Sequence, residues 1–299
     1  MATMPVELGK VREYALATGA IGPAYLADPA APIPPTFLST VVYWESLQDV
    51  LDAPETVAAL AAHGVVPDVG RLLSVEQEYR FAPPLPRAGE VLETRLRFDG
   101  VTAKDGRRGG PMLFVRFAVE FLRDGDRVAE CRYTSAYLAG GAPSSAIDPA
   151  ARRTPVPRVP DSPRWPVDDP GQELPPMVFG PVTMTDVVRY QGASGDLNPM
   201  HHDDELARAH GYPAAFGVGM LGAGYLATYC CAHYGVETVR RFRTRFRDLV
   251  WRGDTLVASA RVTQVVEAEG ERRVELALRL TTDAGGVAVT GSAEFAVPA

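Results

Sequence analysis

Residues 220–234 read MLGAGYLATYCCAHY, and this stretch decides the fold. It is apolar almost all round, and a helix without a polar face should be buried in a core. Gly219 lies at its start, and Gly235 is a natural C-cap. Four runs that alternate like strands follow it, at 240–249, 255–267, 272–282 and 286–296. The sequence therefore predicts an antiparallel sheet wrapped around a buried helix.

The chain before residue 140 has a similar plan. It predicts a weaker helix at 46–63 and strands at 73–81, 91–98, 113–123 and 128–137. Residues 87–90 (RAGE) precede one of these strands much as residues 251–254 (WRGD) precede a strand of the second part. The parallel predicts a duplicated unit of roughly 120–140 residues, which is an ordinary domain size.

Between the two copies, residues 141–176 are dense in proline. Proline removes backbone donors and excludes both a helix and a central strand. We expect an extended linker here, with a long ordered loop inside one domain as the alternative. The expected division of the chain is therefore 1–140, 141–176 and 177–299.

The composition excludes several classes of protein. With 30 basic and 37 acidic side chains, the 299 residues carry a formal net charge of −7, so nucleic acid is not an expected partner. No run of about 18 apolar residues occurs, so we expect no contact with the interior of a membrane. The three cysteines include the adjacent Cys230 and Cys231, and they predict no disulfide framework. This cysteine usage suits a reducing cytoplasm, where we expect the protein to act.

Polar and ionisable residues concentrate in residues 194–203, SGDLNPMHHD. Short helices are expected on either side, at 185–191 and 203–210. Gly195 and Pro199 force a tight turn between them, which can aim three side chains at one point: Asp196, Asn198 and His201. A carboxylate beside an imidazole can take up and return a proton near neutral pH. The alternative is a turn aspartate with a surface histidine.

Residues 190–201, YQGASGDLNPMH, resemble the hydratase motif of the MaoC-like (R)-specific enoyl-CoA hydratases and 3-hydroxyacyl-thioester dehydratases. So do residues 216–221, FGVGML, and the strand entry at 246–254. The resemblance implies an α+β double hotdog fold, in which each half is a long helix wrapped by an antiparallel sheet. It makes 1–140 a non-catalytic scaffold that supplies part of the acyl pocket, and 177–299 the catalytic domain.

The resemblance also implies an activity. This is the reversible hydration of a trans-2-enoyl thioester to an (R)-3-hydroxyacyl thioester, carried on coenzyme A or an acyl carrier protein, with no cofactor beyond that carrier. Asp196 and His201 would be the catalytic pair, and Asn198 would hold the water or the loop. The backbone N–H groups of Gly219 and Met220 begin the buried helix, where they would stabilise negative charge on the thioester oxygen. Two further residues would contact the substrate: Ser194 and Val218.

One position departs from the family pattern. Val218 stands where the family usually has a histidine. Two alternatives therefore stay open: conjugate addition of an amine at the same site, and a non-catalytic protein that binds acyl carriers. The first half lacks a Ser-Gly-Asp…Asn-Pro…His segment, which predicts one active site per chain.

Arginines alternate through 240–247, and they predict either a solvated strand face or a grip on the phosphates of the thioester carrier by Arg243 and Arg245. We expect Arg241 on the opposite face from these two. The G-x-G-x-x-G match at 217–222 lacks a preceding parallel strand, so we expect no dinucleotide. Four possible metal ligands lie close together in the sequence: His201, His202, Asp203 and His210. Their spacing lacks the i, i+4 histidine pair of a zinc-binding helix, so we expect no metal site. His202 should be exposed, and family members suggest a homodimer.

Overall fold

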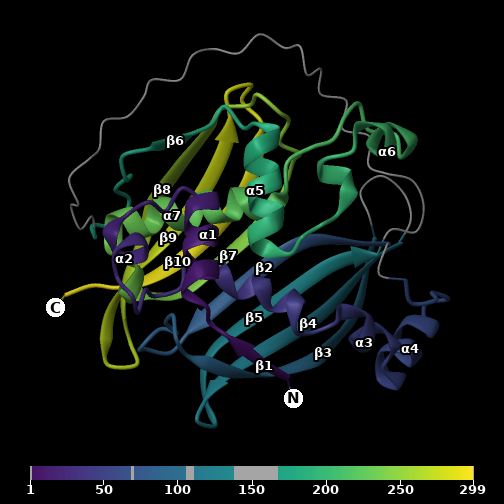
Figure 1. Ribbon diagram of the computed structural model, residues 1–299, viewed down its shortest axis with the longest axis horizontal. Coiled ribbons are helices and arrows are strands. Elements are labelled where there is room, and N and C mark those ends of the chain that lie inside the picture. Colours follow the sequence, from purple (N-terminus) through teal and green to yellow (C-terminus); the bar gives the residue numbers. More distant parts are fainter. Residues whose placement is uncertain (1, 69–70, 106–110, 138–167, 299) are drawn as a thin grey trace.

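A computed structural model describes residues 2–68, 71–105, 111–137 and 168–298 (Figure 1). Ten strands of the described chain form one antiparallel sheet in the order β1-β3-β4-β5-β2-β7-β10-β9-β8-β6. In that order their bounds are Ala2–Pro5, Val91–Asp105, Pro111–Arg123, Asp126–Tyr137, Leu72–Phe81, Val239–Phe246, Val287–Ala296, Glu271–Thr282, Leu256–Ala268 and Met177–Phe179. The eight strands predicted from alternation are confirmed; seven have ends within a few residues of those expected, while β3, expected at 91–98, runs on to Asp105.

The apolar stretch at 220–234 forms helix α7, Gly219–Tyr234. It packs against β7, β8, β9 and β10, and its buried side chains join the main core. Gly235 ends it with φ 86°, the left-handed conformation that favours glycine. The predicted helix and its glycine cap are confirmed.

The remaining helices are short. In the first half they are α1 (Leu8–Ala17), α2 (Pro23–Leu26), the 3₁₀ helix η1 (Phe37–Tyr43), α3 (Leu47–Asp52) and α4 (Pro54–Ala61). In the second half they are α5 (Met184–Ser194), the 3₁₀ turn η3 (Pro199–His201), α6 (Asp204–Ala209) and the 3₁₀ turn η4 (Val236–Thr238). No helix among the described residues is long and apolar enough to cross a membrane.

The two halves are related element by element, since the strand order reads as two copies of one arrangement that meet where β2 pairs with β7. The peptide of Val6 exchanges hydrogen bonds of 2.8 Å with residues 89–90, and that of Val182 exchanges bonds of 2.6 and 2.8 Å with residues 253–254. Helices α1 and α5 follow these contacts and pack against each other. The duplication and the double hotdog architecture are therefore confirmed.

The first half has no counterpart of the full length of α7. The expected helix at 46–63 is broken into α3 and α4, because Pro54 begins α4 and holds Ala53 in an extended conformation (φ −61°, ψ 137°). Both pieces pack on β3, at one end of the sheet (Figure 1). The seven-residue η1 takes the place of α7 in this half, so part of the sheet is left without a long covering helix.

Only the end of the expected linker at 141–176 can be described, because residues 138–167 lie outside the described residues. Residues 168–176 pack on the second half. Leu174 is buried, and its N–H donates to Ala260 O at 2.9 Å. Gly171 N–H donates to Val262 O, also at 2.9 Å. The last residues of the expected linker are thus attached to the edge of the second half.

Candidate active site

The residues of the proton-handling turn begin at the end of α5. Thr183 and Asp186 cap the start of this helix reciprocally, and the helix runs to Ser194, three residues beyond the predicted end. Gly195 then reverses the chain with φ 80°. Ser194 Oγ is buried and accepts from the Asp196 N–H at 3.3 Å, which fixes the first residue of the turn.

The turn brings Asp196 and His201 together, as the sequence predicts. Asp196 Oδ2 lies 4.0 Å from His201 Nε2, and the other carboxylate oxygen accepts from the Asn198 N–H at 3.3 Å. The Asp196 side chain is 39% exposed, whereas that of His201 is 10% exposed. At 4.0 Å the pair is too far apart for a direct hydrogen bond, but one oxygen can lie about 2.8 Å from both atoms. The geometry suits a pair that holds a water or a hydroxyl group between its members.

His201 is held in one tautomer. Its Nδ1 lies 3.0 Å from the carbonyl oxygen of Phe216, so Nδ1 carries the proton and donates it. The ring nitrogen that faces Asp196 is then the free acceptor of the neutral imidazole. Burial lowers the pKa of His201, against the smaller raising effect of Asp196. The ring therefore stays neutral, and able to accept a proton, at physiological pH.

Asn198 serves the loop in this structure. Its side-chain oxygen accepts from the Met200 N–H at 3.0 Å and so begins η3, while its own side chain is exposed. The residue that sequence reasoning missed is Gln191, which is buried in α5. Its amide nitrogen donates to the carbonyl oxygens of Asp196 and Asn198, at 2.8 and 3.0 Å. The only sequence signal for it is a polar residue on the buried face of α5.

A Gln191→Leu variant should lower kcat by about 10- to 100-fold, because the turn loses both of its clamping bonds and small displacements of a catalytic pair are costly. His202→Ala is the matched control. The exposed His202 contacts only the other end of the same amide, at 2.8 Å from Gln191 Oε1, so its loss leaves both clamping bonds in place. Steady-state hydration kinetics on both variants decide the point. Equal losses of kcat in the two variants would show that the hydrogen bonds from Gln191 to the turn do not position the catalytic pair.

The start of α7 lies where the sequence analysis expects the oxyanion site. Gly219 is the first helical residue and is exposed, while Met220 lines the cavity described next. The first N–H groups of a helix have no acceptor within it, and the helix dipole makes this end positive. Val218 precedes them without a capping side chain and is buried in the core. Val218 thus contributes apolar packing where a family histidine would be polar.

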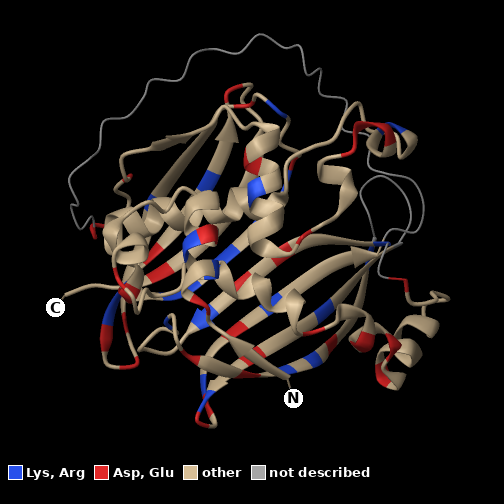
Figure 2. Ribbon diagram, viewed as in Figure 1, with Lys and Arg blue, Asp and Glu red and all other residues tan. Residues whose placement is uncertain are grey.

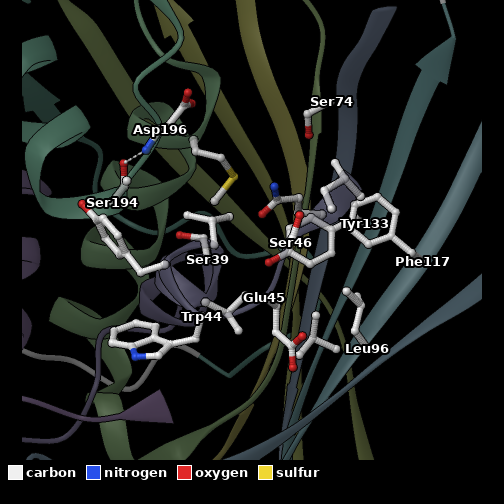
Figure 3. Close-up of a pocket in the computed structure, with 18 of the residues that line it drawn as sticks. Ser39, Trp44, Glu45, Ser46, Ser74, Leu96, Phe117, Tyr133, Ser194 and Asp196 are labelled. Carbon is white, nitrogen blue, oxygen red and sulfur yellow. Dashed lines mark hydrogen bonds between the residues drawn. The ribbon is translucent and has the colours of Figure 1, made fainter. Parts of the chain in front are cut away.

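A cavity of about 680 Å³ extends from Asp196 into the first half of the chain. Figure 3 shows Asp196 and Ser194 on one side of it and Phe117, Tyr133 and Leu96 on the other. The volume is within the usual range for small-ligand pockets. The cavity occupies the region where the first half has η1 in place of a long helix, and residues 41–48 supply part of its wall. The first half therefore builds much of a pocket whose wall also includes Asp196.

Gly195 permits a close approach at the mouth of this cavity. A Cβ atom there would lie 2.8 Å from the Tyr43 ring and 2.9 Å from Val42. We expect Gly195→Ala to lower both activity and melting temperature. Gly211→Ala is the control, since it has the same left-handed strain of roughly 1–2 kcal/mol but open space around its Cβ. If both variants have the same melting temperature and activity, the close contact of Gly195 with Val42 and Tyr43 contributes to neither stability nor activity.

The first half contains a degenerate counterpart of the turn, at residues 18–23 (TGAIGP). Gly19 has φ 75°, and Ile21 N–H donates to its carbonyl oxygen at 3.0 Å, as Leu197 does to Gly195. Three substitutions remove the chemistry: Ala20 stands for the aspartate, Gly22 for the asparagine and Tyr25 for the histidine. The shared backbone supports the duplication, although this turn lacks the three polar side chains of the motif.

Helix α7 packs directly on this counterpart. A Cβ atom at Gly224 would lie 2.4 Å from Thr18 Cγ2, and the Thr228 hydroxyl donates to the Thr18 carbonyl oxygen at 2.8 Å. Helix α7 thus occupies the space beside Thr18, whereas a cavity lies beside Asp196.

The arginines of β7 lie on the outer face of the sheet, where β7 meets β2. Arg241 lies on the same face as Arg243, because Phe242 between them is buried; the expectation that they face opposite ways is wrong. Arg243 bonds Glu76 at 2.8 Å, and Arg245 lies 3.6 Å from the same carboxylate. Figure 2 shows basic and acidic residues interspersed along these strands. Arg243 and Arg245 therefore pair across the junction of the two halves.

The remaining candidate ligands are engaged locally. His210 Nδ1 lies 2.9 Å from the Leu206 carbonyl oxygen, and Asp203 caps α6. Within the described ranges, no group of three or more His, Cys, Asp and Glu side chains is arranged to hold a metal ion.

Comparisons with known proteins match both halves of the chain. Residues 168–284 match the MaoC like domain family, and residues 1–131 match the FAS1-like dehydratase domain region. A search of the curated proteins found no match.

Solved structures extend the similarity to the whole chain. One described as a MaoC-like dehydratase is 20% identical, with a TM-score of 0.72 over 98% of this chain and 95% of the other. A MaoC-like dehydratase from Phytophthora capsici is 19% identical, with a TM-score of 0.67 over 99% and 93%. HtdX of Mycobacterium tuberculosis is 18% identical, with a TM-score of 0.60 over 99% and 98%. At these identities the structures establish a double hotdog fold, while the family matches show a MaoC like domain at residues 168–284 and a FAS1-like dehydratase region at residues 1–131.

Proposed function

We propose that the protein catalyses the reversible hydration of a trans-2-enoyl thioester to an (R)-3-hydroxyacyl thioester. The observation that carries the proposal is the Asp196–His201 pair, held 4.0 Å apart, with Asp196 lining a cavity that runs into the first half. The match to the MaoC like domain supports the hydro-lyase class. The substrate is carried on coenzyme A or an acyl carrier protein, and the reaction needs no other cofactor.

In hydration, a water lies between Asp196 Oδ2 and His201 Nε2. The pair takes one proton as the water oxygen bonds to the β-carbon, and the electron pair of the double bond moves through the α-carbon to the thioester oxygen. A proton returned to the α-carbon completes the addition, so the product gains one water. The neutral His201 can accept at Nε2 because its other nitrogen donates to Phe216.

The negative charge on the thioester oxygen is stabilised by the start of α7. The N–H groups of Gly219 and Met220 point out of the helix end, where positive potential and free donors coincide. The acyl tail lies in the cavity beyond Asp196. The carrier phosphates lie outside it, and Arg243 and Arg245 would reach them only by giving up Glu76. We expect a homodimer, which size-exclusion chromatography with light scattering would test.

The deciding experiment mixes purified protein with trans-2-butenoyl-CoA and longer trans-2-enoyl-CoAs, follows the absorbance of the conjugated thioester, and reads the product mass. Loss of absorbance with the gain of one water supports hydration. The same mixtures with added amines test the alternative nucleophile, since an amine adduct has a different mass. Tight binding without any change of mass would contradict the proposal and favour a non-catalytic acyl-binding protein.

A further inference from the structure

The wall of the cavity in the first half contains buried polar side chains. Gln77 on β2 and Tyr133 and Ser135 on β5 line it, with exposed fractions of 6, 8 and 5%. Gln77 and Tyr133 lie directly opposite each other across the two strands. Tyr133 also stacks on Phe117 of β4, with ring centres 4.7 Å apart (Figure 3). Adjacent positions on β2, β5 and β4 thus present the amide of Gln77, the phenol of Tyr133 and the ring of Phe117 to the cavity.

The donors of this group have hydrogen-bonding capacity to spare. The Tyr133 hydroxyl is buried with no hydrogen-bond partner in the described part of the chain, and the thiol of Cys131, a weak partner, lies beside it. Gln77 Oε1 accepts from the Tyr79 hydroxyl at 2.6 Å, which turns the amide nitrogen away from that contact. Burial raises the pKa of Tyr133, so its hydroxyl remains a donor at neutral pH.

The second half shows what an apolar version of this wall looks like. The strands that correspond to β2 and β5 are β7 and β10, and Thr244 is the one polar side chain among their buried residues; the others are Val239, Phe242, Ala288, Val289, Ala293 and Phe295. Buried polar side chains are therefore more frequent on the two first-half strands than on their counterparts. A purely hydrocarbon tail in the cavity would offer these groups no hydrogen-bond partner, whereas an oxygen in the tail would offer one.

We propose that the cavity accepts acyl thioesters whose tail carries an oxygen, a hydroxyl or a ketone, that accepts hydrogen bonds from Gln77 and Tyr133. The inference rests on the proposed function, because the same cavity holds the acyl tail. The Phe117–Tyr133 stack contacts the carbons on either side of that oxygen. Alkyl tails without oxygen are the disfavoured substrates of the site.

The test compares trans-2-octenoyl-CoA with the same chain hydroxylated at carbon 5, 6 or 7. We expect kcat/KM for at least one hydroxylated chain to exceed that of the plain chain by about tenfold or more, as befits a site with unpaired donors. In Tyr133→Phe and Gln77→Leu the ratio should fall towards one. Tyr133→Phe should do so with little loss of melting temperature, because the deleted hydroxyl has only the weak Cys131 thiol beside it among the described residues. A merely structural role would not move this ratio.

Thr244→Val is the matched control. Thr244 pairs with Gln77 in the next strand, and its buried hydroxyl has no hydrogen-bond partner among the described residues, but it is not one of the cavity-lining residues. Its replacement should leave the ratio unchanged. A preference for the plain chain over every hydroxylated one, or a ratio that survives both cavity variants, overturns the inference. If no chain is hydrated, the proposed function fails, and calorimetric binding of octanoyl-CoA against its hydroxylated forms still decides the tail preference.

Discussion

Asp196→Asn should fold normally and lose hydration activity by a factor of about 10³ to 10⁴, the upper range for a positioned acid–base group. The amide keeps the shape of the side chain and an oxygen to accept from the Asn198 N–H, so the turn survives. The atom that faces His201 at 4.0 Å, however, loses its charge and its ability to take a proton. Initial rates with an enoyl-CoA, together with the melting temperature, separate lost chemistry from lost folding.

His201→Asn should have a similar effect. The asparagine amide can still donate to the Phe216 carbonyl oxygen, but nothing replaces Nε2. Because the two residues act on one water, the double variant should be little worse than either single one. Asp203→Asn is the control, since asparagine also caps helices well and Asp203 caps α6 in the same segment. Full activity in either site variant, or an equal loss in the control, would contradict the assignment.

The pH dependence of wild-type activity follows from the same pair. Burial lowers the pKa of His201 below its ordinary value of about 6.5. Activity that needs the neutral ring should therefore persist at pH 6.5 and fall only at lower pH. The unfolded chain takes up this proton more readily than the folded one, so His201 also makes folding less favourable as the pH falls below about 6.5. Rate profiles and melting curves between pH 4.5 and 8 measure both effects. The His201→Asn variant should lose the part of the pH dependence of stability that comes from His201.

The sequence predicts the elements whose pattern is local and repeated. The strands alternate, and 220–234 has no polar face, so the predicted ends lie within a few residues of the observed ones except for β3, which extends seven residues beyond 98. The break of the helix at 46–63 was missed because apolar spacing outweighed Pro54 in the interpretation. The three- and four-residue edge strands β6 and β1 have too few residues to show alternation. Their position depends on pairing with strands far along the chain.

The site was predictable where its chemistry lies within one turn. Asp196 and His201 are five positions apart, and a single glycine and proline shape the chain between them. Gln191 and the polar cavity wall were not predictable from the sequence, because their roles depend on which groups they contact in the folded chain. The counterpart turn at 18–23 retains only a glycine and a proline of the motif, so its relation to 194–199 becomes clear from backbone hydrogen bonds.

Gly219→Pro should lower kcat by about 100- to 1,000-fold, the usual effect of removing one oxyanion donor. Proline is tolerated at the first position of a helix, where the missing N–H has no acceptor within the helix. Val218 already has the extended conformation that a following proline requires, with φ −71° and ψ 125°. The substitution therefore removes one N–H from the start of α7 and leaves the helix itself able to form.

Gly219→Ala isolates the lost donor from the added bulk. In both variants the new Cβ lies near the Phe246 ring, at 3.1 Å if nothing moves, but only proline removes the N–H. Circular dichroism and melting temperature should be similar for the two proteins, while kcat should differ by the oxyanion factor. If alanine is as slow as proline, contact with Phe246 explains the loss and Gly219 is not the donor. If both are fast, the charge on the thioester oxygen is stabilised elsewhere, with the N–H of Met220 the next donor along the helix.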